Sequence, residues 1–400
     1  MINEIDRISN LERSYVEEVL KTQFSSSRGA TFMRKLEDAF SRRYLERHSI
    51  SFVNGTATMH AALEAAGVGF GDEVLVPPLT MASTTFAVLQ CNATPIFVDI
   101  DPETFQICPE DILNKMTENT KAIITVAIFG GSPQLDVIRE ICDVRGLFLL
   151  EDNAECFGAK FKGVPVGCYG DAASFSFQSS KHLTAGEGGI LLVRDEHVAD
   201  RVRSFQSLGY AGLTAKAAKI DKQIIQKPTY KRHNSLGFNY RMPELCAAVA
   251  LAQVERMDEL LSPRIQVAKR YTEISSCYTD IVQVQKNYKD AENTYWTWVC
   301  KLNPDIDWSD FKDCFVKNGG DPFYGAWSLT YNEPFITELN CYGRENYLTN
   351  NGKRNWISPQ CPVADSVQPY LCQLQTNIFS KEHFDRQTVA WEKTLGEING

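Results

Sequence analysis

Short apolar runs recur between residues 50 and 195 and alternate with segments of helical periodicity. Apolar residues at helical spacing lie between several of these runs, at residues 56–66, 109–116 and 134–144. Strands that alternate with helices form a mostly parallel sheet, which helices cover on both faces. The sequence therefore predicts an α/β fold built on the runs SISFVN, EVLVPPL, PIFVDI, AIITVAIF, LFLLED, AASFSF and GILLV.

The rest of the chain has a different pattern. Residues 209–236 are polar and rich in lysine, which predicts a long loop with one helical turn. A strong helix is predicted from Pro243 to Ser262–Pro263, and a second helical segment follows. The strand-like run YWTWVCKL and a closing amphipathic segment predict a smaller α+β domain. Because 400 residues exceed the usual size of one core, we expect a large domain at 1–262, with an N-terminal helical segment, and a small domain at 263–400.

Charge and hydropathy exclude several classes of function. The formal net charge is -9 with both signs interspersed, so the basic stripe of a nucleic-acid-binding protein is missing. No window approaches the roughly 20 apolar residues that span a bilayer, and the charged N-terminus has no apolar signal region. Twelve cysteines without a C-x-x-C pair and six histidines without ligand spacing predict reduced thiols and no metal site. We expect a cytoplasmic protein with neither a nucleic-acid nor a membrane partner.

A single lysine stands between an apolar run and a glycine-rich turn in the stretch SFSFQSSKHLTAGEGG. At the rim of a buried sheet the ammonium of Lys181 would be poorly solvated, and the neutral amine is the form that makes an imine with an aldehyde. Lys181 is therefore a candidate Schiff-base nucleophile. The alternative from local sequence is a surface lysine at the end of a strand.

Two further runs end in polar groups. LFLLED ends in Asp152, at the edge where open α/β sheets bind ligands, and a carboxylate there would favour a protonated pyridoxal ring nitrogen. An ordinary strand-end acid is the alternative. SISFVN leads through Asn54, Gly55 and Thr56 into a helix, whose first N–H groups would bind a phosphate, although Asn-Gly is also a common turn. The glycines of GVGFG precede a strand and lack the G-x-G-x-x-G spacing, which argues against a dinucleotide site.

These motifs belong to a longer pattern that resembles the DegT/DnrJ/StrS-type sugar aminotransferases, which are fold-type-I pyridoxal-phosphate enzymes similar to aspartate aminotransferase. The resemblance covers nearly the whole chain. It implies a large domain with a mostly parallel seven-stranded sheet between helices, and a smaller α+β C-terminal domain. Its carriers, in the family's order, are NGTATMHAAL, GDEVLVPPLT, ATPIFVDIDPETF, TKAIITVAIFG, LEDNAECFGAKFKGVPVGCYGDAASFSFQSSKHLTAGEGG and LGFNYRMPELCAAVALAQVERMDEL.

The resemblance implies roles for individual residues toward pyridoxal 5'-phosphate. Lys181 would hold the cofactor as a Schiff base, and Asp152 would contact its pyridine nitrogen. Gly55, Thr56 and Ser176 would contact its phosphate. Ser176 stands five residues before Lys181, and in a continuous strand the two side chains would point to opposite faces. The strand is therefore expected to end or bend between them.

The resemblance also implies a homodimer, because in this family a neighbouring subunit completes each active site. The matching segment is NYRM, in which Asn239 is the expected phosphate contact and Arg241 a candidate for substrate. Glu187 is another candidate for substrate contact. His233 in the long loop would reach an anionic substrate in a partner's site, or else lie on a solvated face. The aromatic-rich segment FYGAWSLTYNEPF would line an acceptor pocket, with a core stripe as the alternative.

Two cofactor-binding positions depart from many relatives. Glu155 stands where many have Gln or His beside the phenolic oxygen of the cofactor, and a carboxylate there would disfavour the phenolate. Met81 stands where many have an aromatic residue over the ring face, and its thioether would still pack against the ring.

The reaction implied by the resemblance is transfer of an amino group from glutamate, or glutamine, to a nucleotide-linked keto-sugar by a ping-pong mechanism, with pyridoxamine 5'-phosphate as the intermediate form of the cofactor. Three alternatives share the scaffold. A sugar dehydratase would have His at the position of Lys181, and a cysteine desulfurase would have His directly before it. A catalytically silent cofactor-binding regulator would not need the intact set of Lys181, Asp152 and Ser176.

Overall fold

The computed structural model describes residues 4–24, 31–217, 222–338, 349–350, 353–354 and 360–400. Its main sheet has seven strands in the order β1-β9-β8-β5-β4-β2-β3. Neighbours pair in parallel from β8 to β3, whereas β9 pairs antiparallel with β8 and with β1. The predicted mostly parallel, seven-stranded sheet is confirmed, and each apolar run supplies one strand. The strands are β1 (His48–Phe52), β2 (Glu73–Val76), β3 (Thr94–Phe97), β4 (Thr120–Val126), β5 (Phe148–Asp152), β8 (Ala172–Ser176) and β9 (Gly189–Val193).

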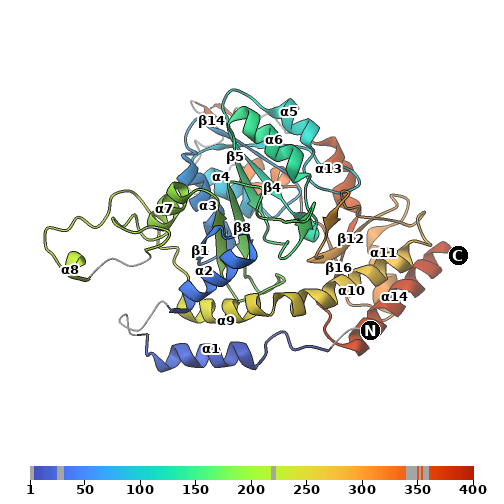
Figure 1. The fold of residues 1–400 in the computed structure, drawn as a ribbon. Coiled ribbons are helices and arrows are strands. Elements are labelled where there is room, and N and C mark those ends of the chain that lie inside the picture. The colour runs from blue at the N-terminus through green and yellow to red at the C-terminus, as the bar shows by residue number, and fades with distance from the viewer. Residues whose placement is uncertain (1–3, 25–30, 218–221, 339–348, 351–352, 355–359) are drawn as a thin grey trace.

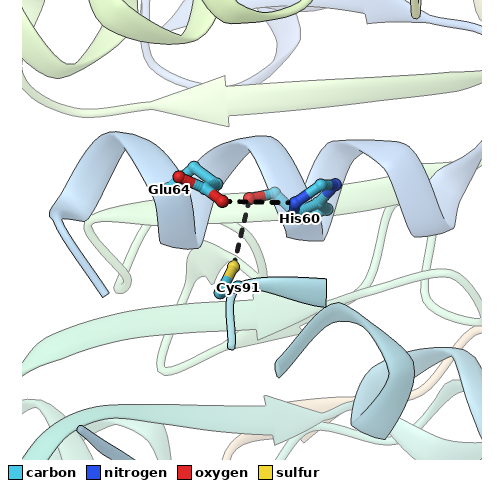
Figure 2. Close-up of side chains that lie close together, drawn as sticks. All are labelled: His60, Glu64 and Cys91. Carbon is cyan, nitrogen blue, oxygen red and sulfur yellow. Dashed lines mark hydrogen bonds and ion pairs between the residues drawn. The ribbon is translucent and has the colours of Figure 1, made fainter. Parts of the chain in front are cut away.

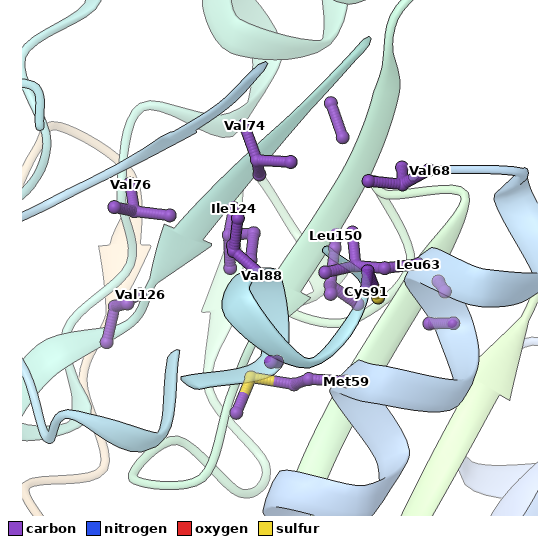
Figure 3. Packing of buried hydrophobic residues seen from close by; sticks show 14 of the residues in the cluster. Met59, Leu63, Val68, Val74, Val76, Val88, Cys91, Ile124, Val126 and Leu150 are labelled. Carbon is purple, nitrogen blue, oxygen red and sulfur yellow. The ribbon is translucent and has the colours of Figure 1, made fainter. Parts of the chain in front are cut away.

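Helices cover both faces of this sheet (Figure 1). Alternate residues of a strand enter different cores: Val74 and Val76 pack with Leu63 of α3 (Figure 3), whereas Leu75 packs in a cluster on the other side. Because both faces are buried, these strands are apolar at nearly every position. The helices are α1 (Asn10–Lys21), α2 (Thr31–Arg43), α3 (Gly55–Ala66), α4 (Ser83–Gln90), α5 (Pro109–Lys115), α6 (Leu135–Arg145), α7 (Glu196–Phe205), α9 (Glu244–Glu255) and α10 (Met257–Ser275).

A second sheet is built from the C-terminal part of the chain and is antiparallel, in the order β10-β12-β16-β13. Its strands are β10 (Val282–Val284), β12 (Thr297–Leu302), β13 (Tyr324–Gly325) and β16 (Leu371–Gln375). α10, α11 (Trp308–Lys317) and α14 (Lys381–Asn399) pack with it around the buried Trp298 and Trp391. The smaller α+β part is therefore confirmed. Short elements complete the chain: β6 (Lys160–Phe161), β7 (Val164–Pro165), β11 (Ala291–Glu292), β14 (Thr349–Asn350), β15 (Lys353–Arg354), α8 (Lys222–Ile225), α12 (Pro334–Thr337) and α13 (Pro362–Val367).

The predicted helix end at Ser262–Pro263 is wrong. α10 continues through Pro263, and the break between α9 and α10 lies at Arg256, whose backbone has φ -96° and ψ 11°. A proline inside a helix lacks the N–H of one backbone hydrogen bond and crowds the carbonyl four residues earlier, yet the buried Pro263 stays within the packed α10. Arg256 stands at the actual break, and its guanidinium forms ion pairs with Glu12 at 2.8 Å and Glu259 at 3.0 Å.

The side chains of α10 pass from one core to the other along the helix. Leu260 and Leu261 pack with the main sheet, whereas Val267 and Tyr271 pack with the second sheet. This change lies close to the expected boundary between residues 1–262 and 263–400, a division that remains a prediction.

Residues 209–236 form the predicted long connection, with α8 as the one helical turn among its described residues (Figure 1). Its two ends are held together, because the Tyr230 hydroxyl donates to the Ala211 carbonyl at 2.7 Å and His233 Nδ1 lies 2.7 Å from the Leu208 carbonyl. Among the described residues, no helix is both long enough and apolar enough to cross a membrane.

Candidate active site

Lys181 lies in the turn that joins β8 to β9. β8 ends at Ser176, so the expected strand end between Ser176 and Lys181 is confirmed. The Lys181 side chain is 13% exposed, and its Nζ lies 3.1 Å from Oε1 of Glu155 and 4.3 Å from the ring centre of Trp296. An amine held between a carboxylate and an indole is fixed in place and largely shielded from water, which suits a nucleophile toward an aldehyde.

The two acids at the end of β5 serve different purposes. Glu151 is fully buried and accepts the Gly167 N–H at 2.6 Å as well as two further backbone N–H groups, so it holds the following turn. Asp152 lines the cavity beside Lys181 and accepts the Thr84 hydroxyl at 2.8 Å. Burial raises the pKa of Asp152, and the Thr84 hydroxyl opposes that rise. Among the described residues no cation forms an ion pair with this buried carboxylate, and a protonated ring nitrogen would supply one.

The first turn of α3 lines the same cavity. Asn54 caps the helix by accepting the Ala57 N–H at 2.9 Å. This cap does not engage the backbone N–H groups of Gly55 and Thr56, which lie at the cavity. A Cβ at position 55 would stand 3.0 Å from the Cβ of Ser176, so glycine lets the helix start approach the Ser176 hydroxyl. Backbone N–H groups at a helix start with an adjacent hydroxyl make a phosphate site without a basic side chain.

Glu155 is 5% exposed and divides its two oxygens between two partners. Oε1 accepts from Lys181 Nζ at 3.1 Å, and Oε2 accepts the Phe129 N–H at 3.1 Å. Burial raises the pKa of Glu155, and the positive charge of Lys181 opposes that rise. The carboxylate therefore faces the nitrogen of the candidate Schiff base.

Substitution of Glu155 by glutamine is expected to lower the midpoint of the pH titration of the bound cofactor's visible absorbance by about one pH unit. The ionised carboxylate stabilises positive charge at the Lys181 nitrogen, so without it this nitrogen loses its proton at lower pH. Because the pKa of Glu155 is raised, the wild-type effect is complete only above that pKa and fades as the pH falls. Glu187→Gln removes an exposed carboxylate from the same cavity and is the matched control. Superimposable curves for wild type and E155Q would refute this role.

One cavity of 730 Å³ unites most of the predicted site residues. Those in its lining are Gly55, Thr56, Met81, Asp152, Glu155, Ser176, Lys181 and Glu187. Asn239, Arg241 and His233 are exposed and lie outside this lining. Asn239 and Arg241 lie in a segment that follows β1, where the Val53 N–H donates to the Tyr240 carbonyl at 2.8 Å. These three residues therefore do not complete their own chain's cavity.

Several residues of the site were missed from the sequence. Thr84, the partner of Asp152, lies in α4 just beyond the end of β2, and the hydroxyl-rich stretch TMASTT after a strand was the available signal. Arg7 and Arg264 come from an N-terminal segment and from α10, and neither has a local motif. The segment FYGAWSLTYNEPF does reach the cavity, through Tyr324 and Trp327.

One group of possible metal ligands occurs among the described residues, away from this cavity. His60 and Glu64 lie one turn apart on α3, and Cys91 follows α4 (Figure 2). His60 Nε2 is 3.5 Å from Glu64 Oε1, and its Nδ1 is 3.2 Å from the hydroxyl of Tyr240. Burial raises the pKa of the Cys91 thiol, which keeps it protonated. A helical ion pair packed against a buried thiol accounts for the group, and we assign no metal to it.

Comparison with known proteins identifies the family. The DegT/DnrJ/EryC1/StrS aminotransferase family matches residues 6–312. The chain belongs to this family. GDP-perosamine synthase of Vibrio cholerae is 32% identical to it over 92% of this chain and 96% of that protein. GDP-perosamine synthase of Escherichia coli O157:H7 is 38% identical over 72% of this chain and 74% of that protein. Among solved structures, an aminotransferase from Psychrobacter cryohalolentis has a TM-score of 0.86 at 24% identity, with both chains fully covered.

Membership makes this chain an aminotransferase, and its cofactor is pyridoxal phosphate or the pyridoxamine form of that group. The predicted fold-type-I class is confirmed. The cavity fits this group, because it presents a helix start for the phosphate, the carboxylate of Asp152 for the ring nitrogen and the amine of Lys181 for the aldehyde. These three roles remain predictions for the individual residues.

Proposed function

We propose that this aminotransferase moves the amino group of glutamate onto a nucleotide-linked keto-sugar, in two half-reactions that share one site. The observation that carries the proposal is the convergence of Lys181, Asp152 and the α3 helix start on one cavity, whose wall on the side of the second sheet is neutral and aromatic. The relatives named as GDP-perosamine synthases favour a GDP-linked sugar as the acceptor.

The chain's own residues would manage the protons of this reaction. Bound pyridoxal phosphate supplies an aldehyde that carries the amino group and a ring that accepts electron density. Asp152 would keep a proton on the ring nitrogen. The Lys181 amine, once the donor has displaced it, would take the proton from the donor's α-carbon. Glu155 holds this amine at 3.1 Å, and Trp296, whose Nε1 donates to the Ser180 carbonyl at 2.8 Å, covers it from water.

The wall contributed by the second sheet suits a sugar. Trp327 stacks on Trp296 with ring centres 5.7 Å apart and planes 18° from parallel. Aromatic faces pack against the apolar faces of sugar rings, and amide groups hydrogen-bond to hydroxyls. The amide and phenol groups among the described lining residues are those of Tyr324, Gln373, Gln375 and Asn377, along with Asn54 and Gln178.

A diphosphate would need charge that this wall does not provide. The described lining contains three basic residues, Arg7, Lys181 and Arg264. Arg7 and Arg264 donate to the Lys181 carbonyl and Lys181 pairs with Glu155, so all three lie around the Lys181 turn and none on the wall from the second sheet. The exposed Asn239, Arg241 and His233 are available to a second copy of the chain, which supports a homodimer with shared sites. A fully active enzyme that sediments as a monomer would refute that arrangement.

Holoenzyme supplied with GDP-perosamine and 2-oxoglutarate is expected to run the transfer in reverse and form glutamate. The mass of the sugar nucleotide should then show that a keto oxygen has replaced its amino group. Initial rates with varied donor and acceptor should give parallel double-reciprocal lines, because the first product leaves before the second substrate enters. Intersecting lines, or loss of water from the sugar without nitrogen exchange, would contradict the proposal. The second outcome would favour a dehydratase.

A further inference from the structure

The segment ahead of α1 is fixed beneath the turn that carries Lys181. Its backbone is held at three points: the Ile5 N–H donates to the Phe379 carbonyl, Arg256 donates to the Asp6 carbonyl at 2.6 Å, and Gln253 donates to the Arg7 carbonyl at 2.8 Å. This segment therefore joins the helices α9 and α10 to the C-terminal part of the chain, and it delivers Arg7 to a defined place.

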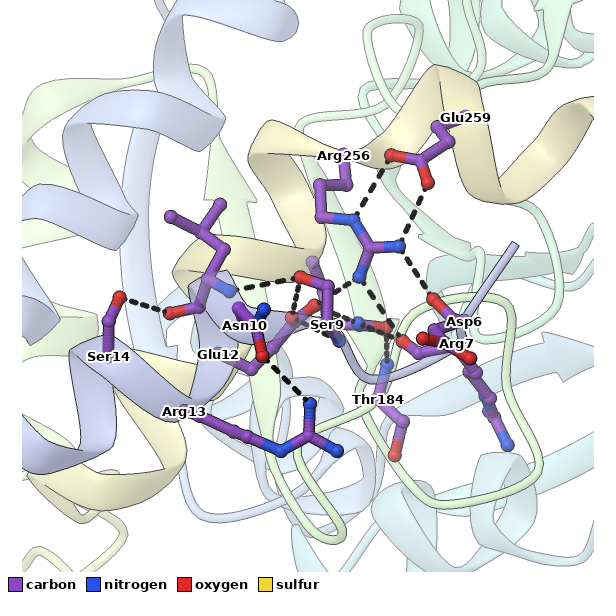
Figure 4. Close-up of polar contacts among 12 residues, drawn as sticks. Asp6, Arg7, Ser9, Asn10, Glu12, Arg13, Ser14, Thr184, Arg256 and Glu259 are labelled. Carbon is purple, nitrogen blue, oxygen red and sulfur yellow. Dashed lines mark hydrogen bonds and ion pairs between the residues drawn. The ribbon is translucent and has the colours of Figure 1, made fainter.

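A buried polar network secures the start of α1 (Figure 4). Glu12 is 1% exposed, closes a capping box with Ser9, and binds Arg256 at 2.8 Å and Gln253 at 2.6 Å. Gln253 in turn accepts the Thr184 N–H, three residues beyond Lys181. The network thus ties the N-terminal segment to the turn that bears the candidate nucleophile.

The Arg7 side chain extends from this segment to the cavity. Its Nη2 donates to the carbonyls of Ser179 and Lys181 at 2.7 Å and 2.8 Å. Its Nε is buried without a partner, and Nη1 makes no hydrogen bond to the described residues. Arg7 lines the cavity together with Lys181. Nη2 of the guanidinium therefore orients the Lys181 turn, and the N–H groups of Nη1 remain available to a ligand.

A second arginine lies beside it without a balancing anion. Arg264 is 1% exposed and donates to the carbonyls of Trp296 at 2.9 Å and Lys181 at 3.5 Å. Burial and, to a smaller extent, the charge of Arg7 together lower the pKa of Arg264 to about 9. Burial also lowers the pKa of Arg7. Among the described residues neither arginine forms an ion pair with a carboxylate, so an anionic ligand would give these two guanidinium groups the partner that they lack.

We propose that Arg7 binds the α-carboxylate of the amino donor, an inference that rests on the proposed function for its amino-acid substrate. The α-carboxylate is bonded to the carbon that carries the reacting amine, so it must lie close to the Lys181 nitrogen that the donor displaces. The phosphate-binding helix start is a separate part of the lining, at Gly55. Asn377 lines the cavity one residue beyond Thr376, which accepts from Arg264 at 3.0 Å, and it supplies a second, neutral donor.

Arg7→Ala is expected to raise the Kd for 2-methylglutamate about 10- to 100-fold, the effect of losing a charge-assisted hydrogen bond. This probe carries a methyl group in place of the α-hydrogen, so it binds without reacting, and the visible absorbance of the holoenzyme reports binding. KM for glutamate and for glutamine should rise together, since both have the α-carboxylate, while KM for the sugar nucleotide stays within about twofold. Arg7→Lys should restore part of the affinity because it retains the charge.

Arg13→Ala is the matched control, because Arg13 lies on the same N-terminal stretch and its guanidinium contacts only Asn10 among the described residues (Figure 4). An R7A enzyme that binds 2-methylglutamate as tightly as R13A would overturn the inference. So would equal losses for donor and acceptor, which indicate a disturbed Lys181 turn. If the parent enzyme uses no amino acid at all, the proposed function fails; if it uses glutamate and R7A is unaffected, only the role of Arg7 fails.

Discussion

Replacement of Lys181 by alanine is expected to abolish multiple turnover, with a loss of at least about 10³-fold in kcat. The variant lacks both the amine that forms the Schiff base and the base that moves the donor's α-proton. Steady-state rates measure the loss of turnover. Borohydride reduction of the wild-type enzyme, followed by mass spectrometry, tests the Schiff base, because it should leave a phosphopyridoxyl mass on the peptide that contains Lys181.

Two further variants separate this chemistry from charge and from folding. Lys181→Arg preserves the positive charge 3.1 Å from Glu155 but cannot supply a neutral amine, so it should be as inactive as the alanine variant. Lys162→Ala removes an exposed lysine that pairs with Asp136 and should retain full activity. Reduction that labels a different lysine in the wild-type enzyme would show that the site has been assigned to the wrong turn.

The strands were predictable because both faces of the main sheet are buried. β4 and β9 need apolar residues at consecutive positions, so the sequence marks them without ambiguity. The end of β8 at Ser176 was also predictable, since Ser176 and Lys181 can share a cavity only if the strand stops between them. The same logic placed Asp152 at a strand end that lines the site.

Long-range contacts account for what the sequence did not reveal. Arg7 reaches the Lys181 carbonyl across 174 positions, and Arg264 reaches it across 83, so no local pattern marks either arginine. The break lies at Arg256, which pairs with the distant Glu12, whereas Pro263, the visible local signal, lies inside a continuous helix. Local propensity therefore gave way to tertiary contacts at the junction that positions the active-site turn.

Asp152→Asn is expected to lower kcat about 10²- to 10⁴-fold while the cofactor remains bound. The carboxylate is 4% exposed, so no water replaces its charge, and an asparagine amide does not hold a proton on the ring nitrogen. The predicted phosphate contacts at the α3 helix start and the predicted bond to Lys181 would not depend on this carboxylate, so absorbance should still report a loaded enzyme. A D152N enzyme that keeps more than about a tenth of wild-type kcat would rule out this role for Asp152.

Thr84→Val gives a graded version of the same test. Burial raises the pKa of Asp152, and the Thr84 hydroxyl, 2.8 Å from Oδ2, lowers it. Loss of the hydroxyl therefore raises the pKa further, and protonation of Asp152 on the acid side begins at a higher pH. The acid limb of the kcat/KM profile should move to higher pH in T84V, with rates near the wild-type value on the alkaline side. Because valine matches threonine in shape but cannot donate, an unchanged acid limb would mean that Asp152 does not govern activity through its charge.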